Sequence, residues 1–163
     1  MNELNIDDDM NNTIAFNSYN EHFLLSNMYP VVIEYKGMKY YGVDNLYHYL
    51  LFFQHPGVQS KIMKKSKGIC ANYQAKKISE DNKELIKGIT DSQKVNLLKK
   101  CMRLKYEQSQ HCKDYLLSTE NKQLIEFAYW GDTFWGCTLK NGEYVGENNC
   151  GKILMELRDE LRG

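Results

Sequence analysis

Two glycine-rich stretches near the end of the chain constrain its fold most strongly. The first is Gly131-Asp132-Thr133-Phe134-Trp135-Gly136, and the second, Gly146-Glu147-Asn148-Asn149-Cys150-Gly151, opens an amphipathic helix. Glycine has no Cβ, so the backbone at these points can approach a flat or charged neighbour closely. The pattern fits a turn that buries Trp135, and it equally fits a carboxylate and an aromatic ring placed around a ligand.

The composition is that of an ordinary globular protein. The chain has 163 residues, of which 42% are hydrophobic and 26% charged, enough for one domain with its own core. Basic and acidic side chains balance at 21 each. Between residues 61 and 105, however, there are thirteen lysines and arginines but only four acidic residues. This segment predicts either a solvated helix surface or a face that meets phosphate.

Cysteine and histidine usage argues against a metal centre. Five cysteines form no Cys-x-x-Cys pair, and the four histidines lack ligand spacing. We therefore expect reduced thiols in a cytoplasmic protein, with no metal and no cofactor. No apolar run approaches the roughly 20 residues that a membrane span needs, so no membrane partner is expected.

Hydrophobic periodicity predicts an α+β domain, mostly helical, with a small antiparallel sheet. The acidic segment 1–12 is predicted to be flexible, and 13–163 to form the domain. A hairpin is expected around Lys36-Gly37, and short strands at 13–16 and 124–129. Helices are expected over 44–54, 58–67, 71–82, 91–109, 112–118 and 151–161, with a further turn at 84–89.

Several polar residues allow two interpretations. Asp44 stands at the start of a predicted helix, where a carboxylate caps free N–H groups, but it could also face a pocket. Lys105 is either a cation at a helix C-terminus or a phosphate contact. Ser26-Asn27 suits ligand oxygens or a turn closed on its own backbone. His48 is a titrating group or a plain helix histidine.

Short motifs stand in a fixed order along the chain, roughly from residue 14 to residue 162. They are Ile14-x-Phe16; Leu25-Ser26-Asn27-x-Tyr29-Pro30; Gly37-x-x-Tyr40-x-x-Val43-Asp44-x-x-Tyr47; Leu104-Lys105-Tyr106; Leu116-Leu117-x-Thr119; Leu124-Ile125-Glu126; Asp132-x-x-Trp135-Gly136; and Gly146-x-Asn148-x-x-Gly151-Lys152-x-Leu154-Met155-x-x-Arg158. This ordered set resembles the motifs of the YbiA-like (NADAR) family.

The resemblance implies a YbiA-like fold and cleavage of an N-glycosidic bond at ribose. It implies Asp44 and Asp132 as catalytic carboxylates, which would stabilise positive charge at the anomeric carbon. Ligand contacts are implied for Ser26, Asn27, Tyr47, His48, Lys105, Trp135, Gly136 and Asn148. The implied ligand is ADP-ribose-like or another ribosylated nucleotide, and ADP-ribosylated nucleic acid is a further implied partner.

The chain departs from the family pattern at four positions. The pattern places Glu-His where this chain has Asp44-Asn45, and a lysine where it has Leu51. A family tryptophan has its counterpart near Thr90. Asp for Glu keeps the charge but retracts it, and a displacement of ~1 Å can cost ~100-fold in rate. Leucine removes imine chemistry at its position.

Two functions therefore follow from the sequence. The first is an N-glycosidase-type hydrolase that acts on an ADP-ribosyl or ribosyl-base nucleotide, for example to remove ADP-ribose from guanine. The second is a catalytically impaired module that sequesters an ADP-ribose-like or cyclic nucleotide, as a sponge or regulator. The high usage of Asn, Lys and Tyr is typical of a low-GC genome, such as that of a phage.

Overall fold

The computed structural model describes residues 12–64 and 67–163. These residues form two compact units. One unit comprises residues 27–112, and the other joins the described residues up to Ser26 with Lys113–Gly163. The predicted flexible segment 1–12 lies almost entirely outside the described residues, and so do residues 65–66 of the predicted helix 58–67.

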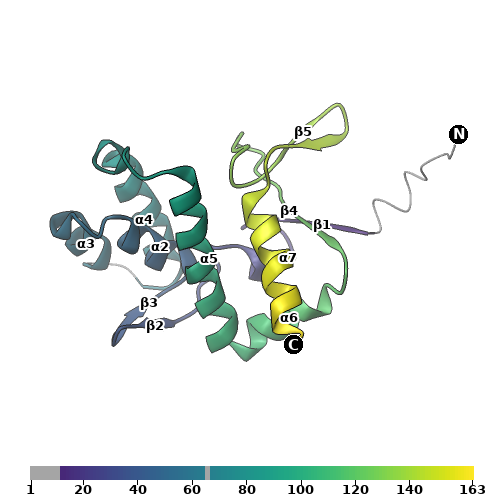
Figure 1. Ribbon diagram of the computed structural model, residues 1–163, viewed down its shortest axis with the longest axis horizontal. Coiled ribbons are helices and arrows are strands. Elements are labelled where there is room, and N and C mark those ends of the chain that lie inside the picture. Colours follow the sequence, from purple (N-terminus) through teal and green to yellow (C-terminus); the bar gives the residue numbers. More distant parts are fainter. Residues whose placement is uncertain (1–11, 65–66) are drawn as a thin grey trace, which may run out of the picture. The chain divides into compact units, whose positions relative to one another are not determined.

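The unit of residues 27–112 is a hairpin followed by helices (Figure 1). Its elements are β2 (Ile33–Tyr35), β3 (Met38–Tyr40), α2 (Val43–Leu51), α3 (Pro56–Met63), α4 (Ile69–Asp81), the 3-10 turn η2 (Lys83–Ile86) and α5 (Asp91–Gln108). Helix α2 is central, since it contacts α3, α4 and α5. Its apolar residues join the core formed by Tyr40, Val43, Leu46, Phe52, Ile62, Ala75, Leu98 and Met102.

Local sequence explains where these elements begin. Pro56 takes the first turn of α3, where its missing N–H costs nothing. Thr90 caps α5 through a capping box, because its Oγ1 accepts from the Gln93 amide (3.2 Å) and Gln93 Oε1 accepts from the Thr90 amide (2.9 Å). The hairpin turn places Lys36 and Gly37 at positive φ, which fixes the antiparallel register of β2 and β3.

Asn72 of α4 joins three segments of this unit. It is fully buried. Its Oδ1 accepts from the Asn45 amide (2.9 Å), and its Nδ2 donates to the carbonyls of Tyr41 (3.0 Å) and Met28 (3.3 Å). The side chain thereby satisfies backbone groups at the entry to α2, which would otherwise be buried without partners.

The second unit is built on a parallel strand pair. Strands β1 (Thr13–Phe16) and β4 (Gln123–Glu126) pair in parallel, and α7 (Asn149–Leu161) contacts β4 (Figure 1). The hairpin β5 (Thr138–Lys140) and β6 (Glu143–Val145) is antiparallel. A 3-10 turn, η1 (Phe23–Leu25), and most of α6 (Gln110–Ser118) complete the unit.

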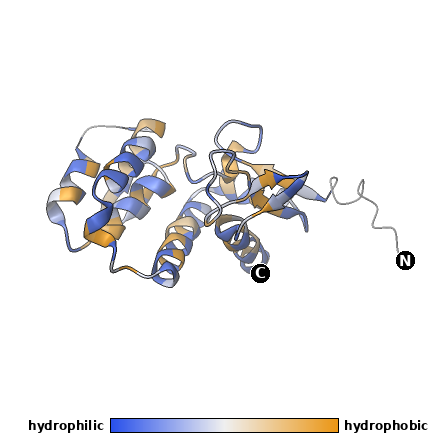
Figure 2. Ribbon diagram, turned by 90° about the horizontal axis from the view of Figure 1, so that it is seen from above, coloured by the Kyte–Doolittle hydropathy of each residue, from blue (hydrophilic) through white to orange (hydrophobic). Residues whose placement is uncertain are grey.

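Helix α7 is amphipathic and covers strand β4. Hydrophobic and hydrophilic residues alternate along this C-terminal helix (Figure 2), and its Leu154 and Leu157 are fully buried. Arg158, also buried, donates to Thr119 Oγ1 and to the Lys122 carbonyl, both at 2.9 Å. The arginine thus ties the helix to the connection between α6 and β4.

The predicted α+β class is confirmed, with helices in the majority and two antiparallel hairpins. One feature differs from the prediction. The pair β1–β4 is parallel rather than antiparallel. More than 100 residues separate its strands, which is long enough for the crossover connection that a parallel pair requires. Within the described ranges, no helix is long and apolar enough to cross a membrane.

Candidate functional site

Asp44 is a carboxyl group with a strongly raised pKa. It lies in the first turn of α2, and its amide donates to the Asn27 carbonyl (3.1 Å). The residue keeps a partly exposed surface, although protein atoms surround its carboxyl group. Burial raises the pKa of Asp44 to about 6, and the positive charges of Lys76 and Lys105 oppose this rise. The carboxyl group therefore titrates close to neutrality.

Lys105 of α5 provides a buried amine beside this carboxyl. Only 1% of its surface is exposed. Burial lowers the pKa of Lys105 to about 8, while Cys112 and Asp44 raise it. The Nζ atom lies 5.0 Å from the ring centroid of Tyr106 and 5.5 Å from that of Tyr29, within the range of cation–π attraction. A buried cation surrounded by rings is equipped to meet an anion.

His48 and Tyr47 follow Asp44 along α2. Residues four apart share a helix face, so His48 lies on the side of Asp44. Burial, with Lys76, lowers the pKa of His48 to about 3, so the imidazole is neutral near pH 7. Its Nδ1 is buried without a hydrogen-bond partner among the described residues. Tyr47 is buried, with its ring edge-on to His48 at 5.0 Å between centroids.

Asp132 and Trp135 belong to the other unit, in the loop before β5. Asp132 Oδ1 accepts from the amides of Phe134 (3.0 Å) and Trp135 (2.9 Å), which closes an Asx-type turn. Trp135 is partly exposed, and its ring contacts Phe134 at 4.7 Å between centroids. Asp132 thus stabilises a turn, as one of the two interpretations of this stretch predicts. Its catalytic role stays a prediction.

Gly136 and Asn148 bring the glycine-rich stretches onto strand β4. A Cβ at Gly136 would lie 2.6 Å from the Glu126 carbonyl, so only glycine fits there. Asn148 is buried at positive φ; its Oδ1 accepts from the Glu126 amide (3.0 Å) and its Nδ2 donates to the Leu124 carbonyl (2.9 Å). The oxygen and the nitrogen of the Asn148 side-chain amide therefore both bond to the backbone of β4. The ligand contacts of Gly136 and Asn148 remain predictions.

The predicted site residues fall into two groups. Asn27, Asp44, Tyr47, His48 and Lys105 belong to the unit of residues 27–112. The other unit holds Ser26, Asp132, Trp135, Gly136 and Asn148. Ser26 is buried, and its Oγ lies 3.1 Å from Ser18 Oγ. Within the described ranges, no group of three or more His, Cys, Asp and Glu residues is placed to hold a metal ion.

Two features of the first group were not predicted. Lys76 on α4 is exposed and acts electrostatically on both Asp44 and His48; the sequence showed it only as one lysine of a basic segment. The burial of Lys105 had a readable signal. Leu98, Cys101, Met102 and Lys105 are three or four residues apart, so the lysine continues the buried stripe of α5.

The fold and these groups define an α+β protein with a carboxyl–amine pair on neighbouring helices. The sequence matches the NADAR domain family over residues 11–162, and the chain belongs to this family. The solved NMR structure of the Escherichia coli protein YbiA is similar, with a TM-score of 0.71, 22% identity, and coverage of 93% of this chain and 86% of that chain.

Curated relatives match over shorter stretches. N-glycosidase YbiA of Escherichia coli (strain K12) is 32% identical over 91 residues, 53% of this chain and 52% of the relative. The chloroplastic riboflavin biosynthesis protein PYRR of Zea mays is 35% identical over 80 residues, 49% of this chain and 12% of the relative. The matched stretch thus spans about half the length of YbiA and a small part of PYRR.

Proposed function

We propose that the protein is an N-glycosidase-type hydrolase that cleaves the bond between ribose and a base in a nucleotide. The observation that carries the proposal is that Asp44 of α2 and the buried Lys105 of α5 act electrostatically on one another, with pKa values of about 6 and about 8. Groups with pKa values on either side of neutrality are typical of catalytic sites. Membership of the NADAR domain family and the similarity to a protein named N-glycosidase support it.

The chemistry assigns a role to each group. As the C–N bond breaks, the base leaves with the bonding electrons and positive charge develops on the anomeric carbon. The Asp44 carboxylate stabilises that charge and accepts a proton from the water that forms the new C–O bond. The departing base takes up a proton from solvent, and Asp44 returns the proton that it accepted to solvent, so that the net reaction consumes one water. Protonated Lys105 favours the ionised form of Asp44 and offers a cation to substrate phosphate.

The finer proposal concerns the substrate. We infer an ADP-ribose-like or ribosyl-base nucleotide, with ADP-ribose attached to guanine as the first candidate. Support comes from the Lys105 ammonium group and the partly exposed Tyr29 ring, whose centroid lies 5.5 Å from it, which suit a phosphate and a stacked base. ADP-ribosylated nucleic acid is the corresponding macromolecular partner in this proposal.

The direct test incubates the protein with an oligonucleotide that carries ADP-ribosylated guanine and measures released ADP-ribose by chromatography. We expect multiple turnovers with the wild-type chain. A parallel reaction with a ribosylated pyrimidine phosphate distinguishes the two substrate classes. If neither substrate is cleaved and neither binds, the proposal is wrong.

Binding without turnover is the second candidate function. Leu51 supplies no nucleophile where the family pattern has a lysine, and its side chain is buried. His48 is neutral near pH 7 and supplies no proton that titrates there. These two observations favour a module that holds its ligand intact. Stoichiometric binding of ADP-ribose by calorimetry, with no release from the oligonucleotide, would support this function over the first.

The pH dependence of cleavage is a specific expectation of the enzyme proposal. Asp44 must be ionised, so kcat/KM should rise through a pKa of about 6. Lys105 must be protonated, so kcat/KM should fall through a pKa of about 8. A bell-shaped profile is therefore expected. Lys105→Arg should move the alkaline limb upward, because arginine stays charged there. An unchanged alkaline limb in this variant would contradict the assignment.

A further inference from the structure

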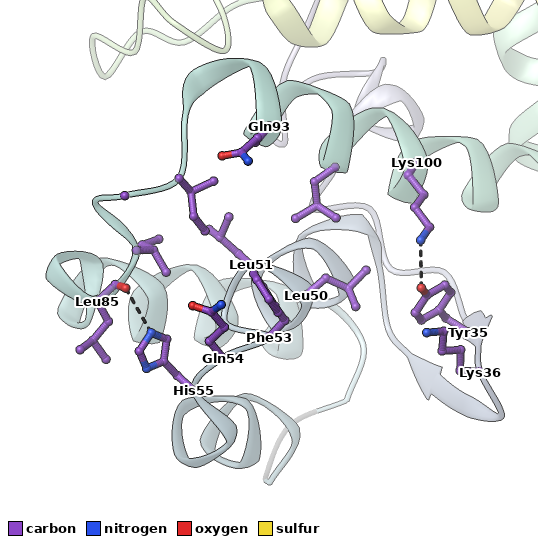
Figure 3. Close-up of a pocket in the computed structure, with 14 residues that line it drawn as sticks. Tyr35, Lys36, Leu50, Leu51, Phe53, Gln54, His55, Leu85, Gln93 and Lys100 are labelled. Carbon is purple, nitrogen blue, oxygen red and sulfur yellow. Dashed lines mark hydrogen bonds between the residues drawn. The ribbon is translucent and has the colours of Figure 1, made fainter.

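A pocket lies within the unit of residues 27–112, and neither Asp44 nor Lys105 is among its lining residues. Its volume is about 640 Å³, which is within the usual range of ligand sites. It is bordered by the hairpin β2–β3, the end of α2 with the segment after it, η2 with the segment after it, and α5. Figure 3 shows Leu50, Leu51 and Phe53 between its two ends.

One end of the pocket is cationic. Lys100 Nζ donates to the Tyr35 hydroxyl (2.9 Å) and lies 4.9 Å from the ring centroid. Lys36 Nζ lies 5.5 Å from the same centroid. Tyr35 therefore gathers two ammonium groups at this end, as Figure 3 shows. The pKa of Tyr35 is lowered, first by the hydrogen bond from Lys100. Both ammonium groups lie at this end of the pocket, so a dianion bound there would be attracted by two positive charges.

The rest of the lining is apolar, with a few amides. Phe53 and Leu85 are 65% and 49% exposed, so they offer uncovered apolar surface. Gln54 and Gln93 place amide groups along the wall (Figure 3). The far end is closed by His55, whose Nε2 donates to the Leu85 carbonyl (3.1 Å). None of the fourteen lining residues carries a carboxylate, so the pocket selects against cations.

We propose that this pocket binds a phosphate monoester of a planar aromatic group. The dianionic phosphate would lie between Lys36 and Lys100, which match its two charges. The aromatic body would cover Phe53 and the leucines, and the glutamine amides would bond heteroatoms on the ring. Neither Asp44 nor Lys105 lines this pocket, although Leu51, at the position where the family pattern has a lysine, does. The proposal rests on the lining of the pocket and does not depend on the proposed glycosidase function.

The test measures binding of 1-naphthyl phosphate by calorimetry at low salt. Binding of inorganic phosphate and of 1-naphthol is measured separately, so that the contribution of the phosphate charge can be distinguished from that of the aromatic ring. We expect 1-naphthyl phosphate to bind at least tenfold more tightly than either part. Equal binding of inorganic phosphate, or no binding of 1-naphthyl phosphate at millimolar concentration, would overturn the proposal.

Variants locate the binding. Lys36→Gln with Lys100→Gln should weaken 1-naphthyl phosphate by about tenfold, because both partners of the phosphate lose their charge. The matched control is Lys39→Gln with Lys94→Gln, which removes one lysine from the same hairpin and one from the same helix outside the pocket. Phe53→Ser, at an exposed position, should weaken 1-naphthyl phosphate but leave inorganic phosphate unchanged. Equal losses in the lysine pair and its control would also overturn it.

Discussion

Replacing Asp44 by asparagine is expected to lower glycosidic cleavage by about 100-fold or more while the fold remains intact. Asparagine keeps the size and hydrogen-bonding capacity of the side chain but carries no negative charge to stabilise the anomeric carbon. The measurement is kcat/KM on ADP-ribosylated guanine oligonucleotide at pH 7, together with the melting temperature of each protein.

The stability readout separates chemistry from folding. Burial raises the pKa of Asp44, so at pH 7 the folded protein holds a charge that its surroundings disfavour. A carboxyl with a raised folded pKa is most favourable to folding below its unfolded pKa, and that advantage is lost as the pH rises towards about 6. Asparagine is uncharged at pH 7, so the variant does not pay the free-energy cost of holding a buried charge. The melting temperature of the variant at pH 7 should therefore equal or exceed that of the wild type.

A surface carboxylate provides the control. Asp81, in the last turn of α4, is exposed and pairs with Lys77 at 3.3 Å. Asp81→Asn should leave cleavage unchanged and alter stability by less than about 1 kcal/mol. Asp44→Glu should retain more activity than Asp44→Asn, because the charge is kept. Full activity in Asp44→Asn would remove this residue from the mechanism and favour binding without turnover.

Local patterns in the sequence predicted most helices and the first hairpin. The apolar spacing of α5 is a local signal that extends over a few turns of helix. The Thr90–Gln93 capping pair is an equally local signal, although the prediction did not use it. The turn at Lys36-Gly37 lies directly between its two strands, so pairing follows from proximity. Such elements are determined by residues close together in the chain, so they can be predicted from a single sequence.

Pairing between distant segments had no such signal. Strand β1 pairs with β4 across more than 100 residues, and nothing in either strand names its partner or its direction. The hairpin β5–β6, which was not predicted, does have a local signal in its turn residues. Asn141-Gly142, both at positive φ, is the preferred pair for a two-residue turn. Its short strands are mostly exposed and lacked a clear alternation.

The candidate site was predicted in part for the same physical reasons. Asp44, His48 and Lys105 are placed by helices, and their shared environment follows once α2 packs on α5. Asp132 and Asn148 are short polar side chains, which bond a ligand or nearby backbone equally well by residue type alone. The structure shows their oxygens and the Asn148 amide bonded to backbone groups of the loop and β4.

The close approach of α7 to β4 predicts a large loss of stability when Gly151 becomes alanine. In an exposed helix this change would stabilise, by up to about 1 kcal/mol. Here a Cβ would collide with the Leu124 carbonyl and with the Asn148 amide. Helix α7 must then move off the strand, and the two Asn148 hydrogen bonds to β4 are strained. We expect a loss of about 3 kcal/mol or more in the free energy of unfolding.

Gly57 in α3 is the matched control, because a Cβ there meets no atom within 4 Å. Gly57→Ala should raise the free energy of unfolding by about 0.5–1 kcal/mol, from helix propensity and the reduced freedom of the unfolded chain. The same substitution thus has opposite signs at two helical positions. Urea denaturation of both variants measures the difference. A Gly151→Ala protein as stable as the wild type would show that α7 does not approach β4 this closely. The claim that close packing requires glycine at position 151 would then be wrong.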